Sequence, residues 1–358
     1  MANESNFPKR RFCFAHVGSC FFGSRQTFAG HHVRKILLFE VNHPDLALIL
    51  VACVADALLG DPVYSLHPVR MLGTWSLFWE RRLFRMGQTG YLGGIVHGVL
   101  VIGGALMAWW GIRFGLQRVH PWAAWGWDVF LAYSLLCMRD LLVHGQRVLH
   151  ALHDLPAARR QLAMLVGRDT VDLPRPDVVR ATIESLAENF TDGVLTPFWA
   201  LCLFGLPGLI VVKAVSGLDS MVGYKNARYR RFGWFGARAD DLANWLSARL
   251  SVPIIMAGAA LLGLYPRLAW HSARRYHAML ASPNSGWSEA ACAGALRIRL
   301  LGPIRYGGTL ANQAFMGDAD WRHDLDATDL RRALRLIMVC ILLASSCGVA
   351  GVLIRAGI

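Results

Sequence analysis

The sequence predicts an all-α polytopic integral membrane protein with five or six membrane segments. Of its 358 residues, 54% are hydrophobic and 17% are charged, whereas roughly 25% of the residues of a soluble domain are charged. The mean hydropathy is +0.36. Several long intervals of the chain also carry no charged residue. These three observations disfavour an ordinary water-soluble enzyme.

Apolar intervals account for the predicted segments in chain order. About 20 apolar residues cross a bilayer core of roughly 30 Å. Intervals 46–60 and 119–138 are weaker because Asp56 and Asp128 interrupt them. Interval 250–266 is uncharged and reaches about 26 Å at 1.5 Å per residue, so it needs a contribution from its flanks. The remaining uncharged intervals are long enough unaided, and they are 86–112, 193–212 and 336–354.

The segment Thr196–Val215 has an unusual sequence for a membrane span, because Gly205, Pro207 and Gly208 divide it into two short halves. Irregular backbone at membrane depth is tolerated only inside protein or beside water. A kinked span and a re-entrant hairpin are the alternatives. The loops on both sides are basic, and the positive-inside rule places both in the cytoplasm. We therefore favour the hairpin, with both flanking loops on the cytoplasmic side of the membrane.

The charge balance is strongly basic, with 37 Lys+Arg against 24 Asp+Glu and a net charge of +13. Such a surplus suits nucleic acid, or membrane loops held against anionic lipid. Because the basic residues are dispersed between the apolar intervals, we expect a lipid bilayer and no nucleic acid as partner. Residues 1–40 are a basic extension without the apolar run of a signal peptide. Residues 41–358 are predicted to form a single membrane-embedded catalytic domain.

Standard cofactor motifs are missing from the sequence. The eight cysteines include no C-x-x-C pair and no zinc-type spacing, so we expect neither a zinc nor a haem site. The chain also lacks G-x-x-x-x-G-K-[ST] and G-x-G-x-x-G. A nucleotide, if one is used, is therefore not held by a standard P-loop.

Polar residues gather in four places, and each is informative because a polar group near a membrane costs free energy. The first, Gly60–Gly73, contains Asp61-Pro, His67-Pro and Arg70. Helix termination explains it at least as well as function does. In the second, Glu184, Glu188 and Asp192 recur every four residues and share one face of a helix. Like charges at this spacing repel, and a bound divalent cation would relieve the repulsion.

The third place joins Leu218–Arg230 to Arg238–Asn244 and contains Lys225 beside Asp240-Asp241. A cytoplasmic basic loop explains its arginines but not the paired aspartates, which suit phosphates and their metal. The fourth, Ser282–Ala290 with Gly302–Gly308, holds glycine and proline turns with amide, carboxylate and aromatic groups. Two explanations of these turns remain open: they only end and begin secondary-structure elements, or their backbone amides contact an anionic ligand.

At these places the chain resembles the CbiB/CobD family of cobalamin biosynthesis, the adenosylcobinamide-phosphate synthases. The resemblance covers about residues 45–308 and departs from the family pattern at Ser216-Gly217, Ser247 and Ile304-Arg305. The motifs that carry it are G-D-P-x-x-x-x-H-P-V-R-x-x-G at Gly60–Gly73, V-G-R-D-T at Val166–Thr170, E-S-L-A-E-N-F-T-D-G at Glu184–Gly193, L-D-S-M-V-G-Y-K-N at Leu218–Asn226, A-R-A-D-D-L at Ala237–Leu242, S-A-R-L at Ser247–Leu250, S-P-N-S-G-W at Ser282–Trp287 and Y-G-G at Tyr306–Gly308.

The resemblance implies an ATP-dependent amide ligase. It would join the carboxylate of adenosylcobyric acid, a cobalt corrinoid, to (R)-1-amino-2-propanol O-2-phosphate or a similar aminoalcohol, with Mg²⁺ as cofactor. A homo-oligomer, or association with later corrinoid-assembly enzymes, is compatible with that role. The expected catalytic residues are Asp61, His67, Glu184 and Glu188; the metal ligands are Glu184, Glu188, Asp192, Asp240 and Asp241; and the substrate or phosphate contacts are Arg70, Arg168, Asn189, Asp219, Ser220, Lys225, Arg238, Asn284 and Tyr306.

A non-catalytic reading is the alternative, either an AmpE-like membrane signalling protein or a corrinoid carrier of the same superfamily. The carboxylates discriminate between the two readings. A carrier or a sensor has little need for the acidic stripe Glu184–Asp192 together with Asp240-Asp241. The sequence therefore favours the ligase.

Overall fold

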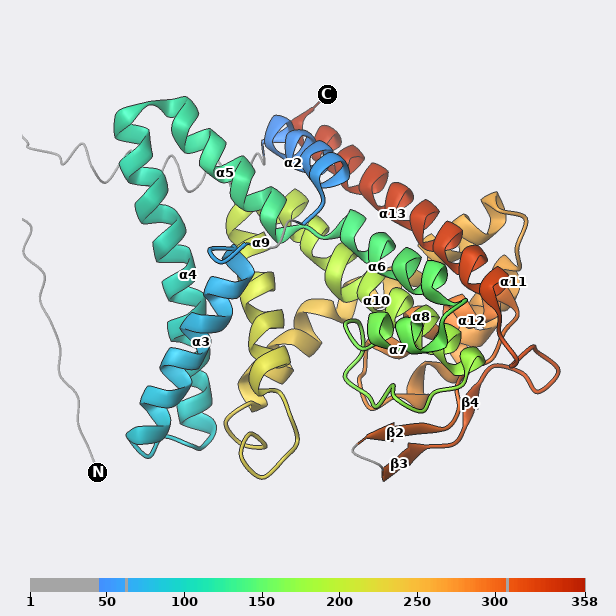
Figure 1. The fold of residues 1–358 in the computed structure, drawn as a ribbon. Coiled ribbons are helices and arrows are strands. Elements are labelled where there is room, and N and C mark those ends of the chain that lie inside the picture. Colours follow the sequence, from blue (N-terminus) through green and yellow to red (C-terminus); the bar gives the residue numbers. More distant parts are fainter. Residues whose placement is uncertain (1–44, 62–63, 307–308, 358) are drawn as a thin grey trace, which may run out of the picture. The chain divides into compact units, whose positions relative to one another are not determined.

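The computed structural model describes residues 45–61, 64–306 and 309–357, and their fold is mainly helical (Figure 1). The predicted all-α class is therefore confirmed for the described residues, apart from two small antiparallel ladders, β1–β4 and β2–β3. The predicted extension 1–40 lies outside the described residues. The elements are α2 Leu46–Leu59, α3 Pro68–Arg85, α4 Tyr91–Val119, α5 Pro121–Leu135, α6 Met138–Ala151, α7 Leu155–Leu162, α8 Arg175–Asn189, η1 Phe190–Leu195, α9 Thr196–Val222, α10 Trp234–Leu261, α11 Pro266–Tyr276, η2 His277–Met279, α12 Ser285–Leu296, β1 Leu300–Leu301, β2 Ile304–Tyr306, β3 Thr309–Asn312, β4 Phe315–Met316 and α13 Ala327–Ala356.

Three stretches of the described chain are long and apolar enough to cross a membrane: α4, the continuous run Arg175–Val222, and α13. The predicted count of five or six segments is thus not confirmed. Interval 46–60 became α2, an apolar helix of 14 residues, and a new helix, α5, begins within interval 119–138, at Pro121. Interval 250–266 contributes only the C-terminal half of α10, whose N-terminal half is charged.

The chain reverses direction within α9. Gly205 has φ 66° and ψ −164°, a conformation almost restricted to glycine, and Pro207 follows it. The Asp192 carboxylate, before this point, lies within electrostatic reach of Asp219, after it. A straight helix would separate the two residues by about 40 Å. The two limbs therefore fold back beside each other, as in a hairpin. Whether they re-enter one side of a bilayer remains a prediction.

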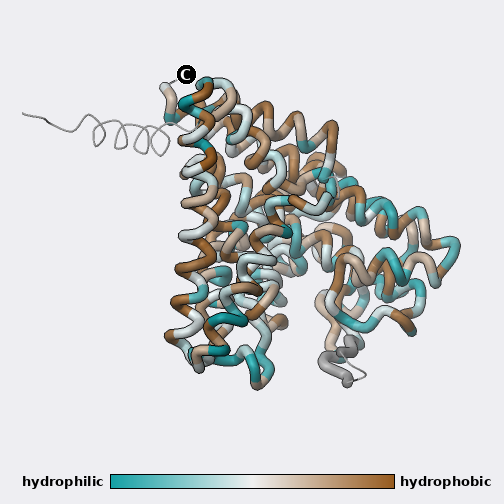
Figure 2. Tube along the Cα trace, turned by 60° about the vertical axis from the view of Figure 1, so that its left-hand side comes forward, coloured by the Kyte–Doolittle hydropathy of each residue, from teal (hydrophilic) through white to brown (hydrophobic). Residues whose placement is uncertain are grey.

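Small residues allow the helices around the site to approach closely. Helix α12 is rich in alanine and glycine and is buried along almost its whole length. A Cβ on Gly294 would lie 2.2 Å from the Leu268 carbonyl oxygen of α11, and one on Gly286 would lie 2.0 Å from the His277 carbonyl oxygen. Helix α12 therefore supports α11 and the connection that follows it. Figure 2 shows predominantly hydrophobic long helices and hydrophilic residues gathered in several connecting loops.

Candidate functional site

The predicted acidic stripe lies at a π-helical turn between α8 and α9. Glu188 is near the end of α8, and Asp192 lies in η1. Such turns are rare and occur frequently at functional sites. Because α9 doubles back, Asp192 lies within electrostatic reach not only of Glu188 but also of Asp219 at the end of α9 and of Asp240 and Asp241 near the start of α10. We call these five residues the carboxylate cluster.

The cluster holds more negative charge than its own hydrogen bonds neutralise. In the described part of the chain, Oδ1 of Asp192 is buried without a hydrogen-bond partner. Asn244 donates a 2.9 Å bond to Asp240, and Arg238 pairs with Asp241 at 3.3 Å. Burial, followed by the charge of Asp219, nevertheless raises the pKa of Asp240 to about 7. A cation entering the cluster would relieve this repulsion.

The donors of the cluster fit Mg²⁺, which prefers carboxylate oxygens. Within residues 45–61, 64–306 and 309–357, no three acidic, His or Cys side chains already converge at the spacing of metal ligands. Mg²⁺ is usually held by one or two carboxylates together with waters and substrate phosphates, rather than by an all-protein cage. The exposed Glu188 and the unpartnered oxygen of Asp192 suit that mode of binding. The magnesium site remains a prediction.

Glu184 is placed differently from the rest of its stripe. Its side chain is buried, and each carboxylate oxygen has a partner within the protein. The Arg168 guanidinium bonds to Oε2, and the Leu301 N–H donates a 2.6 Å bond to Oε1. Leu301 adopts a positive φ of 57°, an uncommon conformation for a residue with a side chain. Glu184 and Arg168, predicted as a metal ligand and a phosphate contact, are thus bonded to one another.

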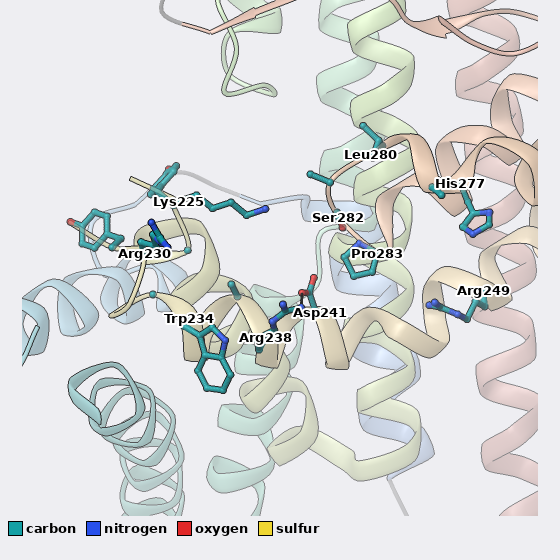
Figure 3. Close-up of a pocket in the computed structure, with 17 residues that line it drawn as sticks. Lys225, Arg230, Trp234, Arg238, Asp241, Arg249, His277, Leu280, Ser282 and Pro283 are labelled. Carbon is teal, nitrogen blue, oxygen red and sulfur yellow. Dashed lines mark hydrogen bonds and ion pairs between the residues drawn. The ribbon is translucent and has the colours of Figure 1, made fainter. Parts of the chain in front are cut away.

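A pocket of about 530 Å³ opens beside the cluster, and its lining includes four cationic side chains, those of Lys225, Arg230, Arg238 and Arg249 (Figure 3). Three segments build it: the loop between α9 and α10, the first half of α10, and the connection between α11 and α12. Three of the predicted site residues line it, namely Lys225, Arg238 and Asp241. Asp241 therefore belongs to both the pocket and the carboxylate cluster.

Asn284 joins two of the predicted motifs at this pocket. Its side-chain amide donates a 2.7 Å bond to the Asp241 carbonyl oxygen, and its Oδ1 accepts a 3.4 Å bond from Arg249. Its backbone N–H is bonded to the Ser282 hydroxyl at 3.2 Å. Asn284 is buried, so it fixes the connection before α12 against α10 and acts from behind the pocket wall.

Arg249 and His277 also line the pocket, and neither was predicted as a site residue. The Arg249 guanidinium lies 4.2 Å from the ring centroid of Trp245 and 5.4 Å from that of Trp287. The His277 ring stacks on Trp287 with centroids 3.9 Å apart. Burial lowers the pKa of Arg249. The motif S-A-R-L contained Arg249, but nothing in the sequence connected it with Trp287.

Glu80 was also missed, and it holds the loop that carries Lys225. This carboxylate of α3 is buried. It accepts bonds of 2.8 and 3.3 Å from Arg228 and of 2.9 Å from the Tyr229 hydroxyl. The Arg228 guanidinium also lies 4.5 Å from the ring centroid of Phe84. The loop at the pocket is therefore anchored to α3 by a buried charge.

Neither Asp61 nor His67 is among the described residues that line the pocket. They bond to each other, with 2.6 Å between His67 Nε2 and Asp61 Oδ1. His67 Nδ1 accepts a 3.3 Å bond from the Val69 N–H and caps α3, so Nε2 must carry the proton that is donated to Asp61. Both ring nitrogens are thus engaged within the protein, which leaves His67, one of the predicted catalytic residues, with no free lone pair. Arg70 is exposed on the first turn of α3.

The remaining predicted contacts divide between the interior and the surface. Asn189 donates bonds of 2.9 and 3.2 Å to the carbonyl and hydroxyl oxygens of Ser185, so it braces α8. Ser220 is exposed on the last turn of α9. Tyr306 belongs to β2, but its side chain lies outside the described part of the structure. The structure therefore groups residues of the second, third and fourth motifs. The first motif approaches the third at Gly73, where a Cβ would lie 3.5 Å from Met221 Sδ, but its Asp61 and His67 bond to each other.

The apolar helices and the combination of a basic pocket with a carboxylate cluster define a helical protein of the membrane class with a site suited to phosphate-bearing ligands. The CobD/Cbib protein family model matches residues 49–337. This chain therefore belongs to the CobD/CbiB family, as its motifs predicted.

Three relatives illustrate this membership. The chain is 39% identical over 317 residues to cobalamin biosynthesis protein CbiB of Salmonella typhimurium, covering 84% of this chain and 98% of the relative. It is 41% identical over 293 residues to cobalamin biosynthesis protein CobD of Geobacter metallireducens, covering 81% and 92%. It is 39% identical over 307 residues to the CobD protein of Photorhabdus laumondii, covering 84% and 95%. No solved structure shows significant similarity to the chain.

Proposed function

We propose that this protein acts in cobalamin biosynthesis as an ATP-dependent amide ligase. It joins the free carboxylate of adenosylcobyric acid to the amine of (R)-1-amino-2-propanol O-2-phosphate, or of a similar aminoalcohol, and yields adenosylcobinamide phosphate. The observation that carries the proposal is the meeting of a basic pocket with a carboxylate cluster at Asp241. One wall suits phosphates, and the other suits the cation that accompanies them.

The chemistry of amide formation explains why both walls are needed. A carboxylate is a poor electrophile, so transfer of the terminal phosphoryl group of ATP to its oxygen first forms an acyl phosphate and ADP. The amine then attacks the carbonyl carbon, loses a proton and displaces inorganic phosphate. Phosphoryl transfer depends mainly on positioning and on charge stabilisation.

The residues divide these tasks between them. Lys225 and Arg238 face the pocket and neutralise phosphate oxygens. Glu188, Asp192 and Asp240 would hold Mg²⁺, which supplies further positive charge to the phosphates. Arg249, fixed between two tryptophan rings, adds a cation whose direction is set by packing. The paired Glu184 and Arg168 support the neighbouring turn of α8.

The test is a reconstituted reaction. Purified protein in detergent receives adenosylcobyric acid, aminopropanol phosphate, ATP and Mg²⁺, and the corrinoid product is measured by chromatography and mass spectrometry. The proposal expects a product that requires both ATP and Mg²⁺. If no such product forms while a CbiB relative is active under the same conditions, the ligase is rejected, and retained corrinoid binding would then favour a carrier.

A substitution in the carboxylate cluster tests whether the ligase activity depends on the cluster. Glu188 is exposed, and its side chain forms no hydrogen bond or ion pair with another described residue, so Glu188→Gln should keep the thermal stability of the protein and abolish turnover. Asp172→Asn, which removes one exposed carboxylate outside the cluster, is the control and should leave turnover unchanged. Activity of Glu188→Gln equal to wild type would remove this residue from the magnesium site.

Topology is tested separately by reporter fusions after Asp192 and after Arg238. We propose that both positions face the cytoplasm at the bacterial inner membrane. The reversal at Gly205 supports this, because it brings the two limbs of α9 back to one end. Reporters on opposite sides would eliminate the re-entrant arrangement.

A further inference from the structure

A group of exposed arginines lies beside the pocket and is separate from the predicted phosphate contacts Lys225 and Arg238. Arg81, Arg82 and Arg85 are exposed at the end of α3, and Arg230 and Arg231 are exposed in the loop between α9 and α10. We call these five residues the arginine collar. Only Arg230 among them contributes to the pocket wall.

The two halves of the collar are held together by aromatic contacts. Phe84 of α3 packs against Phe232 of the loop, with ring centroids 4.9 Å apart. A Cβ on Gly94 of α4 would lie 1.9 Å from the Phe232 carbonyl oxygen, so the backbones of α4 and the loop are in direct contact. Figure 1 shows the end of α3 and the start of α4 at the same end of the helices as this loop. The two segments that carry the collar are therefore in direct contact.

This surface lies at the end of a candidate membrane span. Tyr91 begins α4 and packs edge-to-face against Trp234, with ring centroids 5.7 Å apart. Tyr91 is 51% exposed, Trp234 is 44% exposed, and the next residue of the span, Leu92, is 67% exposed. Amphipathic aromatic residues with an exposed apolar stretch on one side and arginines on the other are typical of the boundary between hydrocarbon and headgroups.

The collar has little acidic charge of its own. Glu80, the carboxylate nearest to it along α3, is buried and already bonded to Arg228 and Tyr229. In the described part of the chain, no ion pair involves any of the five arginines. Basic clusters of this kind beside a span attract the phosphates of anionic lipids.

We propose that the arginine collar binds the phosphate groups of anionic phospholipids and so holds the pocket mouth at headgroup level. The α3 arginines lie outside the pocket lining, which argues against a role for them in binding a soluble phosphate. The aromatic pair places the collar where headgroups are. The proposal does not require the ligase chemistry, and its test does not measure turnover.

The experiment measures thermal unfolding of the full chain in detergent mixed with phosphatidylglycerol or with phosphatidylcholine. Phosphatidylglycerol should raise Tm above the value in phosphatidylcholine, and the gain should shrink as NaCl rises from about 50 to about 500 mM, because salt screens exposed charges. The Arg81→Gln/Arg82→Gln variant should lose at least half of the gain. Its matched control, Arg160→Gln/Arg274→Gln, removes two exposed arginines elsewhere and should retain the gain.

Further arms distinguish the outcomes. Equal gains in the collar variant and wild type would overturn the proposal. So would an equal gain from inorganic phosphate or from the water-soluble headgroup glycerophosphoglycerol, because the surface would then be a site for soluble anions. If the double variant is unstable in phosphatidylcholine, Arg85→Gln provides the same comparison with one charge removed.

Discussion

Asp240 allows the cost of a buried negative charge in the carboxylate cluster to be measured. Its ordinary pKa is 3.8, and burial together with the charge of Asp219 raises it to about 7. Between these values the folded protein keeps a proton that the unfolded chain has released. The free energy of unfolding therefore falls as pH rises from about 4 to 7, and the loss is complete above pH 7.

The size of this effect follows from the gap of about three between the two values. Each tenfold change in a proton-binding constant is worth about 1.4 kcal/mol, so the loss amounts to about 4 kcal/mol at most. Asp240→Asn removes the charge and keeps the oxygen that accepts the bond from Asn244. We expect the variant to match wild type near pH 4 and to be more stable at pH 8.

The assay is urea or thermal unfolding in detergent with EDTA at pH 4 to 8, because a bound metal would lower the pKa of Asp240. Asp326→Asn is the control of opposite sign. Arg322 lowers the pKa of Asp326. The stability that this carboxylate contributes is therefore present above its ordinary pKa and is lost in acid. Asp326→Asn should consequently not stabilise the protein at pH 8. Parallel curves for Asp240→Asn and wild type would refute the reasoning.

The remaining predictions concern the backbone contacts and the loop anchor. Gly94→Ala should lower Tm and activity because its Cβ would lie 1.9 Å from a carbonyl oxygen. Gly103→Ala is the control and should keep or raise Tm, because no described atom lies within 4 Å of its Cβ. An equal response from the two variants would contradict the packing. Gly205→Ala should cost about 1–3 kcal/mol in a denaturant titration because of its backbone conformation, and an unchanged midpoint would argue against the reversal. Glu80→Gln removes the charge that holds the loop, so the KM for ATP should rise several-fold while kcat changes little; a fall in kcat alone would place Glu80 in the chemistry instead.

The hydrophobic pattern predicted the helical class, whereas its count of five or six membrane segments is not confirmed by the three candidate spans of the described chain. Uncharged intervals measure length and polarity, and both were correct for α4 and α13. They do not show where a helix begins. Pro121 restarts the helix within one interval, and the apolar half of α10 continues a charged helix. Each of these boundaries depends on capping and on neighbouring helices.

The periodicity of the acidic stripe predicted a shared face, yet its members have different surroundings. Glu184 and Glu188 are one helical turn apart. One is buried against Arg168 and the Leu301 N–H, and the other reaches solvent. Spacing along a helix orients side chains but says nothing about which segment packs over them. The partner strand comes from more than a hundred residues further along the chain.

The sequence by itself determined the residue types of the site and the family to which they belong. It also marked the break at Gly205, because few residues other than glycine adopt that conformation. Only the tertiary structure decided which motifs meet. The reversal of α9 brings Asp192 to Asp219 and Asp240, and Asn284 joins the last motif to them. His67 remained with Asp61 instead. Such meetings depend on the packing of distant helices, and a local sequence pattern does not contain that information.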